Sequence, residues 1–208
     1  MIIRSLDIRE GDSLVKRKRI NQIIHRGWVD IFMIQESKLV VVDACIIRSF
    51  WNNGNVGWSF VSSKGKFGGI ITLWKEDLFE VICNFKREGC LGLKLLWKGS
   101  NYYVINVYSP CSLPLRSLLW EKLLVFKDKY LDGEWIMRGD FNLIINNRKR
   151  KGRASSRNNS NMLEFSNFIV QIVLVDLPCK GNKYIWFSSN KNSMSRLDSF
   201  LLSNSLID

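Results

Sequence analysis

The sequence has one histidine, no closely paired cysteines and no long apolar run. Its five cysteines show no C-x-x-C spacing, which argues against a cysteine-rich zinc site and favours reduced thiols inside a cell. The single histidine, His25, lies in a helical pattern and is interpreted as a structural or surface residue. No segment is long and apolar enough to span a bilayer, and the N-terminal "MIIRSLDIREGD" lacks the apolar centre of a secretory signal. We therefore expect an intracellular protein without a membrane segment.

Apolar and basic residues are abundant in the sequence. With 208 residues, 46% of them hydrophobic, the chain can bury a sizeable core, and we expect one domain over residues 1–208. The 31 Lys and Arg residues exceed the 19 Asp and Glu residues, which gives a net charge of +12. Such a surplus favours a polyanionic partner, most simply nucleic acid, over an anionic membrane surface.

Short β-branched and aromatic runs separated by Gly, Asn and Lys-Gly breaks predict a strand-rich chain. Between residues 56 and 108 these runs follow one another without a helix, which indicates antiparallel hairpins. The predicted strands are 29–35, 56–62, 68–74, 78–84, 91–97, 102–108, 134–140, 183–188 and 196–203.

Apolar spacing of three and four residues predicts helices over 13–27, 113–131 and 161–177. Gly27 is expected to end the first helix, and Asn161 with Glu164 resembles a capping pair for the last. The segment 146–161 is predicted to be an exposed loop.

Acids and an amide stand at the ends of apolar strand patterns: Asp7, Glu36, Asp140, Asn142 and Asp198. Strand ends gather ligand sites because rigid strands hold convergent side chains. Oxygen ligands suit a hard cation such as Mg²⁺ or Mn²⁺, which takes one or two carboxylates and fills its other positions with water and phosphate. Taken singly, each acid is more simply interpreted as a solvated strand end.

Six motifs occur in a fixed order from residue 2 to 203, and together they carry a family resemblance. They are "SLDIRE", "DIFMIQESK", "FGGIITLW", "INVYSP", "WIMRGDFN" and "SRLDSFLLS". In this order the chain resembles the endonuclease/exonuclease/phosphatase family, and most of all the endonuclease domain of plant LINE-type (non-LTR) retrotransposon polyproteins. The resemblance implies a four-layer α/β sandwich of two mostly antiparallel sheets flanked by helices. It also implies metal-dependent hydrolysis of a phosphodiester, with nicking of DNA that leaves a 3′-hydroxyl for a reverse transcriptase domain in the parent polyprotein, and nuclear localisation.

The resemblance also implies roles for individual residues. Glu36 matches the family's metal-binding Glu, and Asp7 stands where the family has Asn beside the metal. Asp140 matches the Asp that orients or deprotonates the attacking water, and Asn142 matches the Asn that positions that Asp and the phosphate.

Two further matches come from the end of the "INVYSP" block and from "SRLDSF". Tyr108 matches a Tyr whose hydroxyl contacts phosphate, although an ordinary strand aromatic is the alternative. Asp198 matches an acid that supports catalytic geometry, although pairing with Arg196 is the alternative.

Basic residues follow the "RGDFN" block directly and are expected to contact a nucleic-acid backbone, or to act as a nuclear-entry signal: Arg148, Lys149, Arg150, Lys151 and Arg153. The basic residues 16–19 are interpreted equally as a contact surface or as a solvated helix face.

The sequence departs from the family at two places. Leu6, Asp7 and Glu10 replace the usual Trp, Asn and Gly, and Asp7 adds a negative charge beside Glu36. The family's closing Ser-Asp-His motif has no match before Asp208, so we expect a C-terminally truncated domain that lacks the last strand and is weakly active or inactive. The alternatives are a non-catalytic nucleic-acid-binding remnant or pseudogene fragment, and a phosphatase acting on a phospholipid or inositol phosphate.

Overall fold

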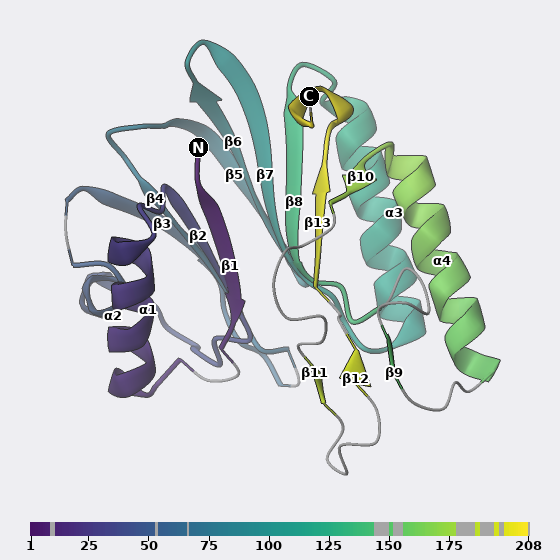
Figure 1. Cartoon of the computed structure of the whole chain (residues 1–208), viewed down its shortest axis with the longest axis horizontal. Coiled ribbons are helices and arrows are strands. Elements are labelled where there is room, and N and C mark those ends of the chain that lie inside the picture. Colours follow the sequence, from purple (N-terminus) through teal and green to yellow (C-terminus); the bar gives the residue numbers. More distant parts are fainter. Residues whose placement is uncertain are drawn as a thin grey trace.

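The chain folds as two β-sheets packed face to face, with helices on the outer face of each. The computed structural model describes residues 1–8, 11–52, 54–65, 67–143, 150–151, 156–177, 186–187, 194–195 and 198–207. Figure 1 shows the layers in order: helices, the first sheet, the second sheet, helices. The predicted four-layer α/β sandwich is therefore confirmed.

The first sheet has the strand order β1-β2-β4-β3. β1 and β2 are parallel, and the other pairs are antiparallel. Its strands are β1 (Ile3–Asp7), β2 (Ile31–Gln35), β3 (Val56–Val61) and β4 (Ile70–Lys75). Helices α1 (Leu14–Arg26) and α2 (Ala44–Phe50) cover its outer face. Ile20, Ile24, Ile47 and Phe50 point from these helices into that layer of the core.

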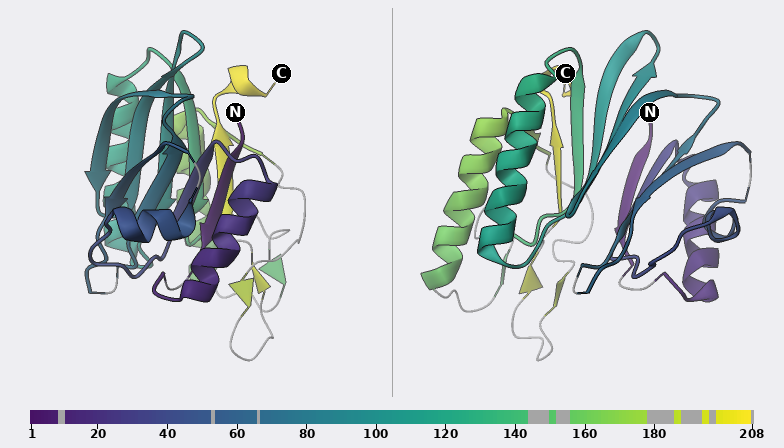
Figure 2. Two further views of the ribbon diagram at one scale, coloured as in Figure 1. Left: turned by 90° about the vertical axis from the view of Figure 1, so that its left-hand side faces the viewer. Right: turned by 180° about the vertical axis from the view of Figure 1, so that it is seen from behind.

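The second sheet has the order β10-β13-β8-β7-β6-β5, in which only β7 and β8 are parallel among the described pairs. Its strands are β5 (Glu80–Arg87), β6 (Cys90–Trp97), β7 (Ser100–Tyr108), β8 (Glu134–Asp140), β10 (Val175–Asp176) and β13 (Asp198–Leu202). Helices α3 (Leu113–Lys129) and α4 (Ser156–Ile172) lie on its outer face (Figure 2). A 3₁₀ turn, η2 (Asn204–Leu206), follows β13.

A small third sheet joins β9 (Arg150–Lys151), β11 (Trp186–Phe187) and β12 (Met194–Ser195) in the order β11-β12-β9. Figure 1 places it at the end of the sandwich toward which β1 and β8 run. The N-terminus and the last described residues lie at the opposite end. None of the helices in the described ranges is long and apolar enough to cross a lipid bilayer.

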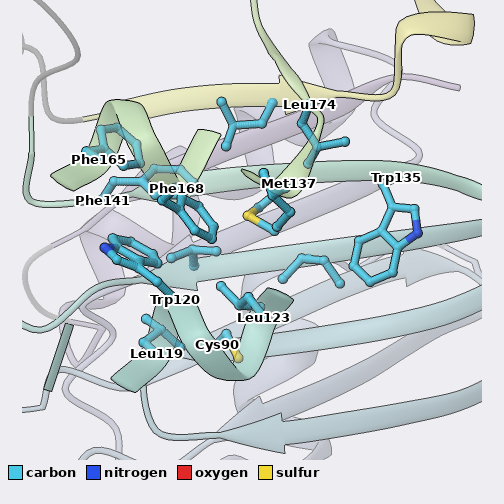
Figure 3. Packing of buried hydrophobic residues seen from close by; sticks show 14 of the residues in the cluster. Cys90, Leu119, Trp120, Leu123, Trp135, Met137, Phe141, Phe165, Phe168 and Leu174 are labelled. Carbon is cyan, nitrogen blue, oxygen red and sulfur yellow. The ribbon is translucent and has the colours of Figure 1, made fainter. Parts of the chain in front are cut away.

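Stacked aromatic rings fill the core between the second sheet and its helices. The Trp120 ring centroid lies 4.4 Å from that of Phe168, 5.7 Å from Phe165 and 5.9 Å from Phe141 (Figure 3). Phe141 directly follows Asp140, so its burial in this cluster fixes the end of β8. Full burial of each such side chain contributes about 1.5–3 kcal/mol.

A buried polar network joins the two sheets beneath the edge where β2 and β7 end. Gln35 Nε2 donates to Asn106 Oδ1 at 2.5 Å, and Ser5 Oγ donates to Gln35 Oε1 at 3.0 Å. Asn106 Nδ2 donates to the Ile71 carbonyl at 3.0 Å and to Thr72 Oγ1 at 3.1 Å. Since buried polar groups are costly unless satisfied, this network specifies how one sheet lies against the other.

Two features of the helices differ from the prediction, and the end of α1 agrees with it. The sequence pattern missed α2, whose N-cap Asp43 accepts a hydrogen bond from the Ile46 N–H at 2.8 Å. Helix α4 begins at Ser156, so Asn161 lies inside it and is not its cap, and part of the predicted loop 146–161 is helix. Helix α1 ends at Arg26 with Gly27 as its C-cap, as predicted, and the left-handed residue is the next one, Trp28, with φ 50° against φ −94° for Gly27.

Candidate active site

The two parallel strand pairs deliver four strand ends to one edge of the sandwich. β1 ends at Asp7 and its neighbour β2 is followed at once by Glu36. In the other sheet, β7 ends at Tyr108 and its neighbour β8 ends at Asp140. Since β1 also contacts β8 and β2 contacts β7 across the sandwich, these four residues share one edge.

Tyr108, Asp140 and Asp198 form a single row across three neighbouring strands. Tyr108 is paired in register with Asp140 on β8, and Asp140 is paired with Asp198 on the antiparallel β13. Residues in register across a sheet point to the same face with their Cβ atoms about 5 Å apart. The Asp198 carboxylate lies 3.8 Å from the guanidinium of Arg138, two positions before Asp140. Arg196, the alternative partner, lies outside the described residues.

Glu36 is held in a strained loop against Tyr108. Its φ is 51°, a left-handed value that residues with a Cβ rarely adopt. The following backbone is fixed to the turn before β4, because the Ser37 N–H donates to Gly69 O at 3.2 Å and the Lys38 N–H donates to Gly68 O at 2.5 Å. Such strain persists where the surroundings determine the geometry, and it concentrates at functional sites.

Gly68 lets Glu36 and Tyr108 approach each other. A Cβ at this position would lie 2.7 Å from Glu36 Cγ and 3.1 Å from Tyr108 Cε1. The glycine-containing block "FGGIITLW" therefore contributes to the site by leaving space for both side chains.

Asn142 ties the end of β8 to the end of β7. Its N–H donates to Asp140 Oδ1 at 2.7 Å, and its side-chain amide donates to the Ser109 carbonyl at 2.5 Å. Asn142 has φ 52°, so it does not continue an extended strand and does not point beside Asp140 as strand alternation predicts. The backbone N–H of Asn142 therefore orients the Asp140 carboxylate, whereas the side-chain amide of Asn142 binds the Ser109 carbonyl in the loop after β7.

Gly139 allows β8 to lie close to β7 just before Asp140. Its φ is 152°, and a Cβ at this position would collide with the Val107 carbonyl. The two backbones therefore approach closely at Gly139 because this residue has no side chain.

Burial, together with the negative charge concentrated at this edge, raises the pKa of Asp140, of Tyr108 and of the Cys111 thiol. Burial, and then the charges of Asp198, Asp7 and Glu36, raise the pKa of Asp140 to about 7, against a smaller lowering by the Asn142 N–H. Burial, and then the charges of Glu36, Asp140 and Asp7, raise the pKa of Tyr108 above its ordinary value. Tyr108 therefore remains a neutral phenol that can donate a hydrogen bond at neutral pH.

The donor set fits a divalent cation held by few protein ligands. Within the described residues, no three His, Cys, Asp or Glu side chains stand close enough together to form a metal cluster. Mg²⁺ needs only one or two carboxylates and keeps several waters, so Glu36 with Asp7 is a sufficient pair. Burial is the largest cause of the raised pKa of Asp140, and the charges of Asp198, Asp7 and Glu36 raise it further, so a cation at this edge would relieve that part of the shift.

The predicted basic contact loop lies mostly outside the described residues. Arg148, Lys149 and Arg153 are not described, whereas Arg150 and Lys151 form β9 at the same end of the sandwich as the acidic edge. His25 is exposed on α1 and its Nε2 lies 2.7 Å from Asn52 Oδ1, as expected for a surface residue.

Sequence reasoning missed three polar residues next to the site: Gln35, Asn106 and Arg138. Gln35 and Asn106 join the sheets, and Arg138 sits between Asp198 and the Phe200 ring. The available signal was a polar residue inside an otherwise apolar buried strand, as in "IFMIQ" and "YYVINVY".

Solved structures share this architecture at low sequence identity. The AP endonuclease LMAP from Leishmania major matches with a TM-score of 0.72 and 18% identity over 98% of this chain and 79% of that chain. The endonuclease domain of TRAS1, a telomere-specific non-LTR retrotransposon, matches with a TM-score of 0.70 and 15% identity over 99% of this chain and 86% of that chain. An endonuclease/exonuclease/phosphatase family protein from Bacteroides thetaiotaomicron matches with a TM-score of 0.64 and 16% identity over 98% of this chain and 83% of that chain.

No protein-family model matches the sequence, and neither does any curated protein. Identities this low establish a common fold and leave the activity open. The chain therefore has the α/β sandwich fold of the endonuclease/exonuclease/phosphatase proteins.

Proposed function

We propose that this chain hydrolyses phosphodiesters with the help of a divalent cation, and that it nicks DNA as the endonuclease of a non-LTR retrotransposon. The carrying observation is the row of Tyr108, Asp140 and Asp198, which faces Glu36 and Asp7 across one edge of the sandwich. A net charge of +12 and the likeness to a retrotransposon endonuclease domain support DNA as the substrate. In this proposal the partner is a reverse transcriptase domain of the same polyprotein, and the two act together in the nucleus.

Each residue at the edge has a chemical role in this proposal. Glu36 and Asp7 would hold Mg²⁺ or Mn²⁺, which would supply positive charge to the phosphate oxygens. Asp140, oriented by the Asn142 N–H, accepts a proton from the attacking water. Tyr108 donates its hydroxyl to a non-bridging phosphate oxygen, where negative charge grows during the reaction.

The remaining polar groups keep this geometry in place. Asp198, paired with Arg138, lies beside Asp140 and fixes its position in the row. The Gln35–Asn106 hydrogen bond holds the sheet that carries Glu36 against the sheet that carries Asp140. A site of this kind needs no covalent nucleophile, since water positioned against a polarised phosphate is sufficient.

Conversion of supercoiled plasmid to the nicked circle tests the proposal. We expect nicking with Mg²⁺ or Mn²⁺, none with excess chelator, and loss of about 10² or more in rate for Asp140→Asn. Asp77→Asn is the matched control, because Asp77 is exposed in the turn after β4, at the opposite end of the sheet. Nicking that survives chelation, or equal rates for Asp140→Asn and the wild type, contradicts the proposal.

Metal binding can be followed without activity. The cation should raise the melting temperature of the wild-type chain, and Glu36→Gln should reduce that increase because it removes a charged ligand. An equal increase for both proteins would remove Glu36 from the metal site.

A second candidate is nucleic-acid binding without cleavage. It is favoured by the acidic character of the edge, where Asp7 adds a charge, and by the position of the chain's single histidine on α1 and away from this edge. It predicts salt-sensitive DNA binding with no nicking under any cation, because phosphate contacts release counterions.

A further inference from the structure

Helix α1 carries a second charged surface that the acidic edge does not explain. Two grooves flank this helix, one of about 350 Å³ against α2 and one of about 280 Å³ against β1. The first is lined by Arg17, Lys18 and Arg48 together with amides, and the second by Arg4, Arg19 and Arg26. Neither lining contains an Asp or Glu from the described part of the chain.

The three arginines of the groove against β1 are available to a ligand. Arg4, Arg19 and Arg26 are exposed, and the structure records no ion pair between them and any described residue. Arg19 and Arg26 are two helical turns apart on one face of α1, which separates them by about 10 Å along the axis. Cations with this separation can contact different phosphates of one polynucleotide strand.

An exposed tryptophan stands at the end of the same groove. The Trp28 side chain is 79% exposed, and its neighbour Gly27 lines the groove. The Arg4 guanidinium lies beside Gly27, because a Cβ on that glycine would approach Arg4 Cζ to 2.8 Å.

The backbone of Trp28 makes this exposure more informative. The Trp28 N–H donates to His25 O at 3.5 Å and the Val29 N–H donates to Ile24 O at 3.3 Å, the bonding pattern of a Schellman helix end. The left-handed position of that motif normally holds glycine, yet here it holds Trp28 with φ 50°. The chain thus keeps a large apolar ring in water at a position where the fold itself favours glycine.

We propose that the α1 surface formed by Arg4, Arg19, Arg26 and Trp28 binds single-stranded nucleic acid, with phosphates on the arginines and one base stacked on the indole. Base–aromatic stacking beside a cationic groove is how proteins hold single strands without reading sequence. The inference rests on the proposed function for its choice of nucleic acid as the polyanion.

This surface is separate from the acidic edge. Arg4 and Asp7 are three positions apart on β1, so about 10 Å of strand lies between them. The odd spacing directs their side chains to opposite faces of the sheet. β1 is an edge strand of its sheet. A polynucleotide bound at α1 would therefore reach the acidic edge by passing around β1.

Fluorescence anisotropy of a labelled oligothymidylate of about 12 nucleotides, with the full chain in chelator, tests the proposal. The charge reversal Arg19→Glu with Arg26→Glu should weaken binding about tenfold and lower the slope of log K against log salt by about 2. The control, Lys122→Glu with Lys129→Glu, makes the same charge change on exposed residues of α3, on the far side of the molecule. Equal weakening by both pairs would show an unspecific effect of net charge and overturn the proposal.

Trp28→Gly separates the binding role from a structural one. Glycine suits the left-handed position, so the variant should melt no lower than the wild type, yet it should bind oligothymidylate about tenfold more weakly. Binding of a duplex of the same length should not depend on Trp28. If Trp28→Gly binds the single strand with wild-type affinity, the proposal is overturned. It is also overturned if Arg19, Arg26 and Trp28 are needed for binding to phosphatidylserine vesicles but not for binding to oligothymidylate.

The two proposals fail in different ways. Asp140→Asn should bind the oligonucleotide as the wild type does, because it leaves the α1 surface intact. A chain that binds through Trp28 but never nicks refutes the proposed function alone, whereas a nicking enzyme whose binding ignores Trp28 refutes this inference alone.

Discussion

The Gln35 side chain donates to Asn106 across the interior at 2.5 Å, and this contact joins two sheets that each carry half of the candidate site. Both residues lie one or two positions from site residues, Gln35 before Glu36 and Asn106 before Tyr108. Both are also almost fully buried. The geometry of the acidic edge therefore depends on a polar contact in the core.

Replacing Asn106 by Ala should destabilise the fold. The change removes the acceptor of the buried Gln35 amide, and a buried unsatisfied group costs about 1–3 kcal/mol. Urea denaturation measures the loss. The control Asn84→Ala lies on the exposed edge strand β5 and should change the free energy of unfolding by less than about 0.5 kcal/mol. Similar losses for both variants would show that the inter-sheet contact has no special importance.

The metal-free protein should lose stability as the pH rises toward neutrality. The folded pKa of Asp140 is about 7 against an ordinary value of 3.8, so folding favours the protonated carboxyl. Its contribution to stability is complete below about pH 4 and is lost as the pH rises through 7. Asp140→Asn should therefore melt higher than the wild type at pH 8 in chelator and vary less between pH 5 and 8. The exposed Asp77→Asn should follow the wild-type curve, and a wild-type curve that is flat over this range would contradict the expectation.

A methyl group at Gly139 should disrupt the junction of β7 and β8. The Cβ of Gly139→Ala would collide with the Val107 carbonyl in a backbone conformation that also disfavours alanine. We expect a loss of about 3 kcal/mol or more in the free energy of unfolding. Gly54→Ala is the control: it has φ 77° but nothing within 4 Å of the new methyl group, so only the left-handed cost of about 1–2 kcal/mol applies. Equal losses in chemical denaturation would show that the close approach is unimportant.

Removing the hydroxyl of Tyr108 should show whether this residue contacts the phosphate or only packs as a strand aromatic. Tyr108→Phe keeps the contact with the Phe67 ring, whose centroid is 5.7 Å away, and so should preserve stability while lowering the nicking rate by about 10²–10³. Tyr102→Phe is the control, because Tyr102 lies at the other end of β7 and packs on Trp97. Since its pKa is raised, Tyr108 should not cause a fall in rate on the alkaline side below about pH 10. A full rate for Tyr108→Phe would return this residue to a packing role.

The strand-end residues could be predicted because their signal is local. An acid that directly follows an apolar β run, as in "IFMIQE" and "WIMRGD", marks the carboxyl end of a strand, and such ends meet at an edge. The structure brings Asp7, Glu36 and Asp140 together there, while their chemical roles stay predictions. The four-layer sandwich was implied by the family resemblance that the six motifs carry, and the structure confirms it.

Features that depend on distant contacts could not be predicted in this way. Gln35 and Asn106 are 71 positions apart, and nothing near either residue specifies the other. Helix α2 has seven residues, too few for apolar spacing to distinguish it from a loop. Trp28 was missed for a different reason: the adjacent Gly27 is the usual stop signal, and the left-handed position fell one residue later.

The placement of the chain ends has a practical consequence. The N-terminus and the last described residues lie at the end of the sandwich opposite the acidic edge (Figure 1). A tag, a fluorescent protein or a tether to a sensor surface at either of these ends would thus leave the acidic edge facing solution. Kinetic and single-molecule measurements on an immobilised chain should then report the same site as measurements in free solution.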